Sequence, residues 1–458
     1  MGDRSGTGIW RVLPSGAAAL NRRLQSHQAA RRALTQTLIG GISIQVTLIA
    51  TGVMLARALG PEDRGYLAML ILIGVLAVQI TPMGLPYALT YAIARVPGRA
   101  IDVVRELKRA IWIRLLAGPL FTALLLGGLT IGKPTYVRIG AVAVVAVMAF
   151  AFVQRCGLAM LQGFQEFTSF NVLRVAPNAA FALGVGALLL VGKDEFIAMA
   201  FAWAVSRGMF APVTIRRARK EAERHQDPGA PDPPETSWIL RFGRRSMIGA
   251  APPVEAYRID QSVVALFLAP TSLGLYVVAL AFVNLPRFIA QAVGMVASPL
   301  TSASESQAGA KRRMWQFFWG AIPLYLPIII ALWIAAPQLT EFFFGTEFAD
   351  AAPLSRLLLI ATVPYCARRV LTDAARGAGY SGAGSVAELA AFLGVIPMFA
   401  VLVPMSGVLG VGYALIASSA LAFAVLVGML LHSRARHSTP SGWFDALAPA
   451  RPDTSETA

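Results

Sequence analysis

Charged side chains inside apolar segments are the groups of this sequence best placed to do chemistry. Arg258, Asp260 and Arg287 each lie about halfway along a segment that is otherwise almost entirely apolar. A charge at the centre of a bilayer costs roughly 2.5–3.5 kcal/mol on insertion scales, and a side chain reaches the headgroups with difficulty from that depth. These groups are therefore expected to face a water-filled interior, where arginine forks suit the oxygens of a phosphate.

A closed polar bridge is the structural alternative for the same residues. Glu255 and Arg258 are three positions apart on one predicted helix face, so they could form an ion pair. Asp260 could lock two helices together by pairing with an arginine. The carboxylates of Glu255, Asp260 and Glu388 also suit the exchange of a proton or a sodium ion when a cavity changes sides. The sequence leaves these interpretations open.

Five further arginines lie within apolar segments but nearer to the segment ends. Snorkelling to the headgroups explains them as readily as a role in an interior cavity does. They are Arg114, Arg155, Arg174, Arg207 and Arg356.

Metal, disulfide and nucleotide chemistry find no support in the residue pattern. Cys156 and Cys366 have no CxxC partner, and the four histidines lie in tails or loops. The GxGxxG match at residues 377–382 lacks a surrounding βαβ pattern. We therefore expect no cofactor and no metal, with a proton or sodium gradient as the candidate for energy coupling.

Composition identifies the kind of protein that must position these charges. The chain has 458 residues, of which 56% are hydrophobic and 14% charged, and its mean hydropathy is +0.62. Soluble domains carry about 25% charged residues, so the sequence predicts a polytopic membrane protein. The net charge of +16 comes mostly from short segments between apolar runs. There it sets topology and attracts anionic lipids, which excludes a nucleic-acid partner.

Twelve apolar stretches are long enough to cross a bilayer as helices of about 20 residues. They predict an all-α protein with two six-helix lobes, at 35–214 and 239–432, joined by a cytoplasmic linker at 215–238. Tails occupy 1–34 and 433–458. The expected spans are 35–56, 66–93, 110–131, 137–161, 168–191, 196–213, 246–267, 273–298, 315–336, 351–371, 384–404 and 408–431.

Loop charges predict the orientation. Basic residues concentrate in the loops on the same side as the two tails, and Arg368 and Arg369 are counted there as charges at the inner end of a span. By the positive-inside rule, the protein lies in the inner or plasma membrane with both of its termini in the cytoplasm. Proline pairs and glycine near residues 82–86, and prolines at 252, 253 and 286, predict bent helices in both halves.

Two similar turns indicate an internal repeat. Residues 56–66 and 265–276 each join two apolar runs. Three positions match at one fixed offset: Leu59 with Leu268, Pro61 with Pro270, and Gly65 with Gly274. A chain built from two similar halves is typical of membrane transporters.

The same turns carry a resemblance to a known family. Residues 56–66 are followed by Leu240-Arg241-Phe242-Gly243, then Arg258-Ile259-Asp260, then residues 273–279. This order resembles the polysaccharide transporter (O-antigen flippase-like) branch of the MOP superfamily, which also contains the MATE drug exporters and the lipid II flippases. The resemblance covers residues 35–432. The two extra helices of lipid II flippases are not found in the sequence, which disfavours that branch.

The resemblance implies two six-helix bundles around a central cavity, and a cargo of polyprenyl-diphosphate-linked oligosaccharide that is moved to the outer leaflet by alternating access. The cationic lumen of such transporters would be supplied here by Arg258, Arg287, Arg174 and Arg155. Membrane lipids, and a polysaccharide polymerase with other assembly proteins, are the partners implied.

Three alternatives remain at this stage. A MATE-like exporter of small cations would want more carboxylates than arginines in its lumen. A membrane polymerase or ligase would need acids on the outer face, where only Glu341, Glu347 and Asp350 gather beside three phenylalanines. A non-transporting member of an assembly complex is the third.

Overall fold

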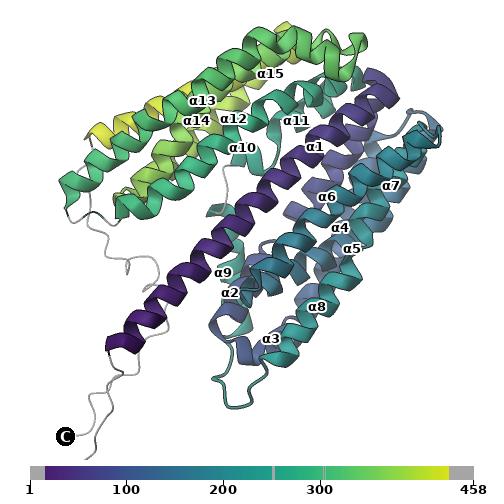
Figure 1. Cartoon of the computed structure of the whole chain (residues 1–458). Coiled ribbons are helices and arrows are strands. Elements are labelled where there is room, and N and C mark those ends of the chain that lie inside the picture. The colour runs from purple at the N-terminus through teal and green to yellow at the C-terminus, as the bar shows by residue number, and fades with distance from the viewer. Residues whose placement is uncertain (1–15, 250–252, 303, 305, 433–458) are drawn as a thin grey trace, which may run out of the picture.

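The computed structural model describes residues 16–249, 253–302, 304 and 306–432 (Figure 1). All regular structure in these ranges is helical, which confirms the expected all-α class. The expected C-terminal tail and the first 15 residues of the expected N-terminal tail lie outside the described ranges.

Fifteen α-helices make up the described chain, with short 3-10 turns at Pro97–Arg99 and Thr346–Phe348. In order they are α1 (Gly16–Ile80), α2 (Leu85–Arg95), α3 (Ala100–Glu106), α4 (Lys108–Leu129), α5 (Thr135–Gly163), α6 (Phe167–Leu190), α7 (Phe196–Gly208), α8 (Ala211–Arg224), α9 (Thr236–Gly249), α10 (Pro253–Ala256), α11 (Ile259–Phe267), α12 (Pro270–Ser302), α13 (Gln307–Phe344), α14 (Ala351–Gly377) and α15 (Ser381–His432).

The expected membrane spans correspond to these helices. Within the described ranges, eight helices are long and apolar enough to cross a membrane. Two of these, in α1 and α15, hold two spans each because the chain reverses at Gly60 (φ 67°) and Gly407 (φ 56°), a conformation that glycine adopts without a Cβ clash. The remaining two expected spans are α14 and the broken stretch from α9 to α11.

The seventh span is not the continuous helix expected over 246–267. It is divided into α9, α10 and α11, and Arg258 between the last two has a left-handed backbone (φ 44°, ψ 49°). The first part, α9, packs on α2 of the first half, where Gly84 and Gly243 approach so closely that a Cβ on Gly84 would lie 2.0 Å from the Gly243 carbonyl oxygen. The second span is also interrupted, between Ile80 and Leu85, as its prolines predict.

The connection between the halves is partly helical. Helix α8 continues to Arg224, whose guanidinium binds the buried Glu221 at 2.9 Å, and the irregular stretch of the linker is 225–235. This irregular stretch is held by Arg99, which donates to the carbonyl oxygens of Pro228 (2.9 Å) and Ala230 (3.0 Å).

The helices form two groups. Helices α2 to α8 lie on one side of α1, and α12 to α15 lie on the other (Figure 1). The groups approach each other at the end where α11 lies and diverge toward the other end, where α1 begins. We name these the closed end and the open end.

The closed end is held by a reciprocal contact between the two repeated turns. A Cβ added to Gly65 would lie 1.8 Å from the Pro270 carbonyl oxygen, and one added to Gly274 would lie 2.1 Å from the Pro61 carbonyl oxygen. The four residues are thus two matched pairs of the repeat, each glycine facing the other half's proline. We call this the glycine contact, because only residues without a side chain let the backbones approach this far.

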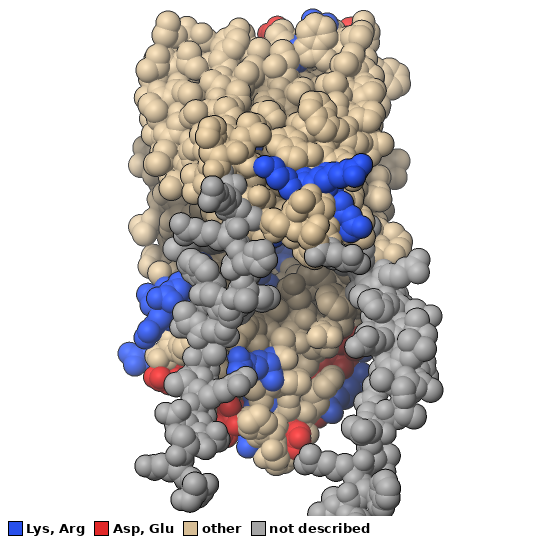
Figure 2. Space-filling view, turned by 90° about the vertical axis from the view of Figure 1, so that its left-hand side faces the viewer, with Lys and Arg blue, Asp and Glu red and all other residues tan. Residues whose placement is uncertain are grey.

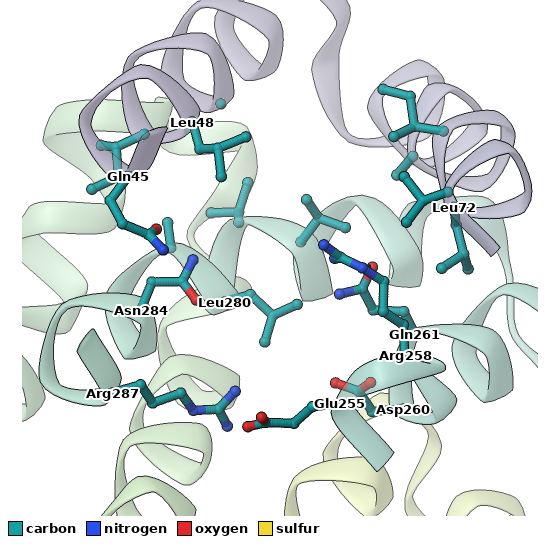
Figure 3. A pocket seen from close by; sticks show the side chains of 18 of the residues that line it. Gln45, Leu48, Leu72, Glu255, Arg258, Asp260, Gln261, Leu280, Asn284 and Arg287 are labelled. Atoms are coloured by element: carbon teal, nitrogen blue, oxygen red, sulfur yellow. The ribbon is translucent and has the colours of Figure 1, made fainter. Parts of the chain in front are cut away.

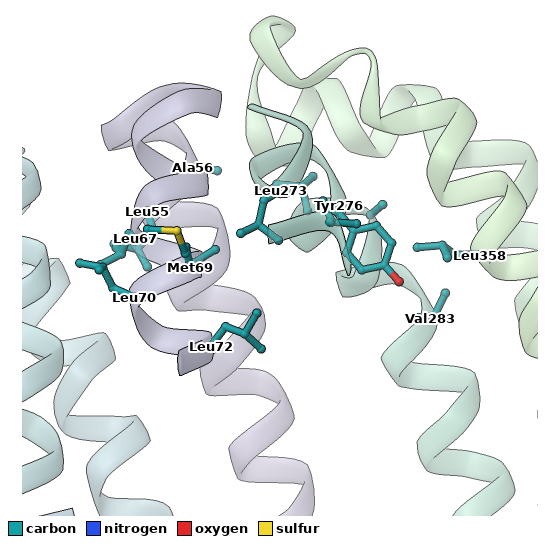
Figure 4. Packing of buried hydrophobic residues seen from close by; sticks show 14 of the residues in the cluster. Leu55, Ala56, Leu67, Met69, Leu70, Leu72, Leu273, Tyr276, Val283 and Leu358 are labelled. Atoms are coloured by element: carbon teal, nitrogen blue, oxygen red, sulfur yellow. The ribbon is translucent and has the colours of Figure 1, made fainter. Parts of the chain in front are cut away.

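An arginine and a shared apolar core extend the same contact. Arg57 of α1 donates to the carbonyl oxygens of Phe343 (2.9 Å) and Phe342 (2.5 Å), which satisfies the exposed end of α13. Below it, one hydrophobic cluster runs from Leu55 and Leu67 of α1 to Leu273 and Tyr276 of α12 (Figure 4). Both halves therefore share one core at this end.

The outer surface of both groups is apolar. Large side chains such as Leu116, Leu124, Leu183, Trp319 and Met405 are mostly exposed, which suits contact with lipid rather than water. On the face shown in Figure 2, Lys and Arg gather in a strip at mid-height and along the lower end, and the surface is hollowed below the strip.

A bulky side chain in the glycine contact should open the closed end. We expect Gly65→Leu or Gly274→Leu to lengthen the distance between spin labels placed on the exposed residues Lys193 and Asp350, measured by pulsed EPR in detergent, because overpacking of about 1–3 kcal/mol cannot be relieved without separating the helices. Gly128→Leu, where nothing lies within 4 Å, is the matched control and should leave the distance unchanged. The same distance in all three variants would contradict the role of the contact.

Candidate functional site

A cavity of about 670 Å³ lies between the two groups of helices. Its wall is formed by α1, α6 and α7 from the first half and by α10 to α15 from the second. Six arginines face three carboxylates in this wall, which leaves an excess of three positive charges. They are Arg64, Arg207, Arg258, Arg287, Arg368 and Arg369, with Glu255, Asp260 and Glu388.

Arg258 reaches the cavity from the break in the seventh span. Its side chain is exposed and its Nη1 donates to Gln261 Oε1 at 3.4 Å. A left-handed backbone at a residue other than glycine is strained and persists where the surroundings demand it, most often at functional sites. The break therefore presents the guanidinium to the cavity instead of to the helix surface (Figure 3).

Arg287 and Glu255 point toward one another across the cavity (Figure 3). The guanidinium carbon of Arg287 lies 4.7 Å from the centre of the Tyr365 ring. The expected pairing of Glu255 with Arg258 is not what the structure shows, because the left-handed turn at Arg258 removes the two side chains from a common helix face. Asp260 instead accepts a 2.6 Å hydrogen bond from the Tyr276 hydroxyl.

Arg368 and Arg369 belong to the cavity rather than to a charged helix end. Arg368 is only 5% exposed and forms an ion pair with Glu388 of α15, while Arg369 pairs with Asp373 at 3.2 Å. Their interpretation as topology-setting charges is therefore incomplete. The spacing of Tyr365, Arg368 and Arg369 on one helical face was the signal that could have found them.

Arg207 and Arg64 are further wall residues that sequence reasoning did not assign to the site. Arg207 of α7 donates to Asn178 Oδ1 at 2.8 Å and lies with its guanidinium carbon 5.7 Å from the centre of the Trp203 ring. Arg64 follows two acids in the first of the repeated turns, and its side chain is 7% exposed and lines the cavity.

Arg174 and Arg155, predicted as lumen residues of the first half, do not line this cavity. The Arg174 guanidinium carbon lies 5.3 Å from the centre of the Phe170 ring on α6. Arg155 is half-buried on α5 beside Tyr87 of α2. The structure therefore brings together Arg258, Arg287, Glu255, Asp260 and Glu388, and places the first-half arginines of the prediction elsewhere.

The cavity suits an anion and shows no built metal site. No group of three or more His, Cys, Asp or Glu residues that could hold a metal ion occurs among the described residues. Guanidinium groups in a space screened from bulk water attract phosphate oxygens more strongly than they do at a surface.

Comparison with known proteins identifies the family. A model of the polysaccharide biosynthesis protein family matches residues 33–305, which is more than half of the chain. The chain therefore belongs to this family. No curated protein matches it. The resemblance drawn from the repeated turns is confirmed at the level of the family.

Solved structures place the fold of this family member among the MOP transporters. A multidrug resistance MATE family transporter in its inward-facing conformation gives a TM-score of 0.67 at 16% identity, over 87% of this chain and 100% of that one. The outward-facing conformation of a MATE family transporter gives 0.55 at 16%, over 92% and 96%. Lipid II flippase MurJ, inward closed, gives 0.59 at 12%, over 86% and 87%. These values confirm the expected fold, and the eight long apolar helices of the described residues support a multi-pass membrane protein.

The buried pair of Arg368 and Glu388 should be sensitive to the loss of one partner. We expect Arg368→Met to lower the stability to unfolding by about 3–5 kcal/mol, because an uncompensated carboxylate remains, and Arg368→Met with Glu388→Leu to recover much of it. Thermal denaturation in detergent measures both.

An exposed pair is the control for that experiment. Arg219 and Glu223 lie 2.8 Å apart with both side chains largely exposed, so Arg219→Met should cost at most about 1 kcal/mol. Equal losses at the two sites, or no recovery in the double variant, would show that the pair at Arg368 is not a buried one.

Proposed function

We propose that this family member is a flippase that moves a polyprenyl-diphosphate-linked oligosaccharide from the inner to the outer leaflet by alternating access. The observation that carries the proposal is the excess of arginine over carboxylate in a cavity between two halves of an apolar chain. Such an excess suits a cargo with a diphosphate and disfavours a cationic one.

The cargo divides naturally between the cavity and the lipid. Arg258 and Arg287 would bind the diphosphate oxygens, and the sugars would occupy the remaining polar wall of Gln45, Gln261 and Asn284 (Figure 3). The prenyl chain would stay in the bilayer, where it keeps its apolar surroundings. A volume of about 670 Å³ falls within the range of ligand cavities and accepts several sugar units at most.

In alternating access, the end that is now closed would open and the end that is now open would close. Helix α1 begins and helix α15 ends at the open end. If both chain termini lie in the cytoplasm, as the loop charges predict, the open end faces the cytoplasm. The greater likeness to the inward-facing MATE conformation than to the outward-facing one supports this assignment. Separating the glycine contact would then open the outer side.

Coupling to a proton or sodium gradient would use the wall carboxylates Glu255, Asp260 and Glu388. Each lies beside an arginine or a tyrosine that depends on its charge, so gain of a proton at any of them changes the packing between helices. No nucleotide or nucleic acid is needed for such a cycle. A polymerase and other assembly proteins that use the glycan would be its partners.

A MATE-like exporter of small molecules is the second candidate. The likeness to MATE transporters favours it as a fold, but three carboxylates among six arginines would bind a cationic drug poorly. A polymerase or ligase finds less support still, because the acids Glu341, Glu347 and Asp350 lie outside the cavity wall.

Removal of a cavity arginine should slow cargo flipping without removing the protein from the membrane. We expect Arg258→Ala or Arg287→Ala to reduce flipping of a polyprenyl-diphosphate glycan in liposomes by about 10- to 100-fold, which corresponds to the loss of about 1.5–3 kcal/mol of charge-assisted hydrogen bonding. Arg138→Ala, which removes an exposed arginine, is the control. Unchanged flipping in both cavity variants would reject the assignment.

An imposed ion gradient tests the coupling. We expect a proton or sodium gradient to accelerate flipping by the wild-type protein and to lose its effect in Glu388→Gln or Asp260→Asn, because an amide cannot exchange the ion. Initial rates in liposomes with and without each gradient measure this. Equal rates under all conditions would exclude coupling at these carboxylates.

A further inference from the structure

Arg64 is a buried cation without a partner. Its side chain is 7% exposed and lines the cavity, yet it makes no hydrogen bond or ion pair with any described residue, and its Nε is buried without an acceptor. Other wall arginines are compensated: Arg207 binds Asn178, Arg287 faces Glu255, and Arg368 pairs with Glu388.

The acids nearest in sequence do not compensate it. Asp63 accepts a 2.7 Å hydrogen bond from the Tyr136 hydroxyl, and neither Glu62 nor Asp63 lines the cavity. Consecutive residues of a helix point about 100° apart, so the acids face away from the cavity while Arg64 faces into it. On the face of α1 that carries Arg64, the next wall residues, Ala68 and Leu72, are apolar.

An uncompensated guanidinium in such a place costs stability. Buried charges in proteins are paired or meet a ligand, because desolvation without a counter-charge is strongly unfavourable. A charge held this way at a cavity wall is therefore explained by an anion that enters the cavity. The wall residues that the first half supplies from α1, α6 and α7 include no carboxylate, since Glu255, Asp260 and Glu388 all come from the second half.

The position of Arg64 links it to the closed end. It directly precedes Gly65 of the glycine contact, and Arg64, Ala68 and Leu72 lie on one face of α1 that forms the cavity wall. The backbone that carries the guanidinium is thus the backbone that closes the cavity. An anion bound here would touch the helix that must move when this end opens.

We propose that Arg64 forms a second anion site, supplied by the first half of the chain, which binds a phosphoryl group at the closed end of the cavity. Arg64 comes from α1 of the first half, whereas Arg258 and Arg287 of the proposed cargo site come from the second half. The inference rests on the proposed function only for the identity of the cargo, because binding of a phosphoryl anion can be measured without transport. A phosphoryl group of a lipid-linked diphosphate and that of an anionic phospholipid headgroup have the same chemistry at this site.

Binding of inorganic pyrophosphate to the purified full-length protein in phosphatidylcholine nanodiscs tests the site. We expect pyrophosphate to raise the thermal unfolding midpoint of the wild type and to change its tryptophan fluorescence, since Trp203 lines the cavity. Arg64→Gln should weaken the apparent affinity at least about tenfold, the effect of losing one charge-assisted contact. Arg138→Gln, an exposed arginine, is the matched control and should bind as the wild type does.

Two further measurements separate a ligand site from a structural role. Without added anion, Arg64→Gln should unfold at a higher temperature than the wild type, because an unpaired buried charge has been removed; a structural role predicts the opposite. Arg64→Lys keeps the positive charge but loses the two-pronged donor geometry of the guanidinium. It should therefore bind pyrophosphate more weakly than the wild type and more tightly than Arg64→Gln. If Arg64→Gln does not fold, the pyrophosphate affinity of Arg64→Lys relative to that of the wild type still tests the site: equal affinities would contradict it.

Replacing phosphatidylcholine by phosphatidylglycerol in the nanodiscs tests which molecule supplies the phosphoryl group. Stabilisation of the wild type, but not of Arg64→Gln, by phosphatidylglycerol nanodiscs without pyrophosphate would support the site and assign it to a phospholipid headgroup. Wild-type affinity for pyrophosphate in Arg64→Gln would overturn the proposal. Pyrophosphate binding that depends on Arg64 in a protein that flips no lipid-linked glycan would leave this site standing and reject the flippase function.

Discussion

The cost of holding a guanidinium away from water governs the interior of this protein. Three of the cavity arginines are each offset by a particular neighbour: an amide for Arg207, a carboxylate for Arg368, and an aromatic ring with a facing carboxylate for Arg287. Because such charges are tolerated in a membrane protein only when paired or hydrated, the two halves must enclose a polar space. The buried arginines require a polar cavity, and the cavity in turn depends on them for its positive charge.

The second constraint is the close approach of two backbones at the closed end. The repeated turns meet through Gly65 and Gly274, each against a proline carbonyl of the other half. Such a contact tolerates no added atom, and it is extended by Arg57 and by a hydrophobic cluster that both halves share. It lies next to Arg64, and the charge at the cavity wall and the closure of that wall are therefore carried by adjacent residues.

Broken helices connect these two constraints. The interruptions at 81–84 and at Arg258 free polar backbone inside the apolar region, where it is tolerated only if it is buried in protein or lines a cavity. At the first break, Arg114 donates to the Pro82 carbonyl at 2.9 Å. At the second, the break presents Arg258 to the cavity. In the first half, the freed carbonyl at the break is bound by an arginine of a neighbouring helix. In the second half, the break instead places an arginine in the cavity wall.

The sequence alone determined the class of protein, the twelve spans, the internal repeat and the mid-span charges at Arg258, Asp260 and Arg287, because hydrophobic length and the cost of buried charge are local properties of a segment. Only the tertiary structure decided which helix faces meet. It placed Arg64, Arg368 and Arg369 in the cavity wall and left Arg155 and Arg174 outside it. It also separated Glu255 from Arg258, since one left-handed residue changes which side chains share a face. Distances between segments far apart in the chain depend on packing, and no single segment encodes them.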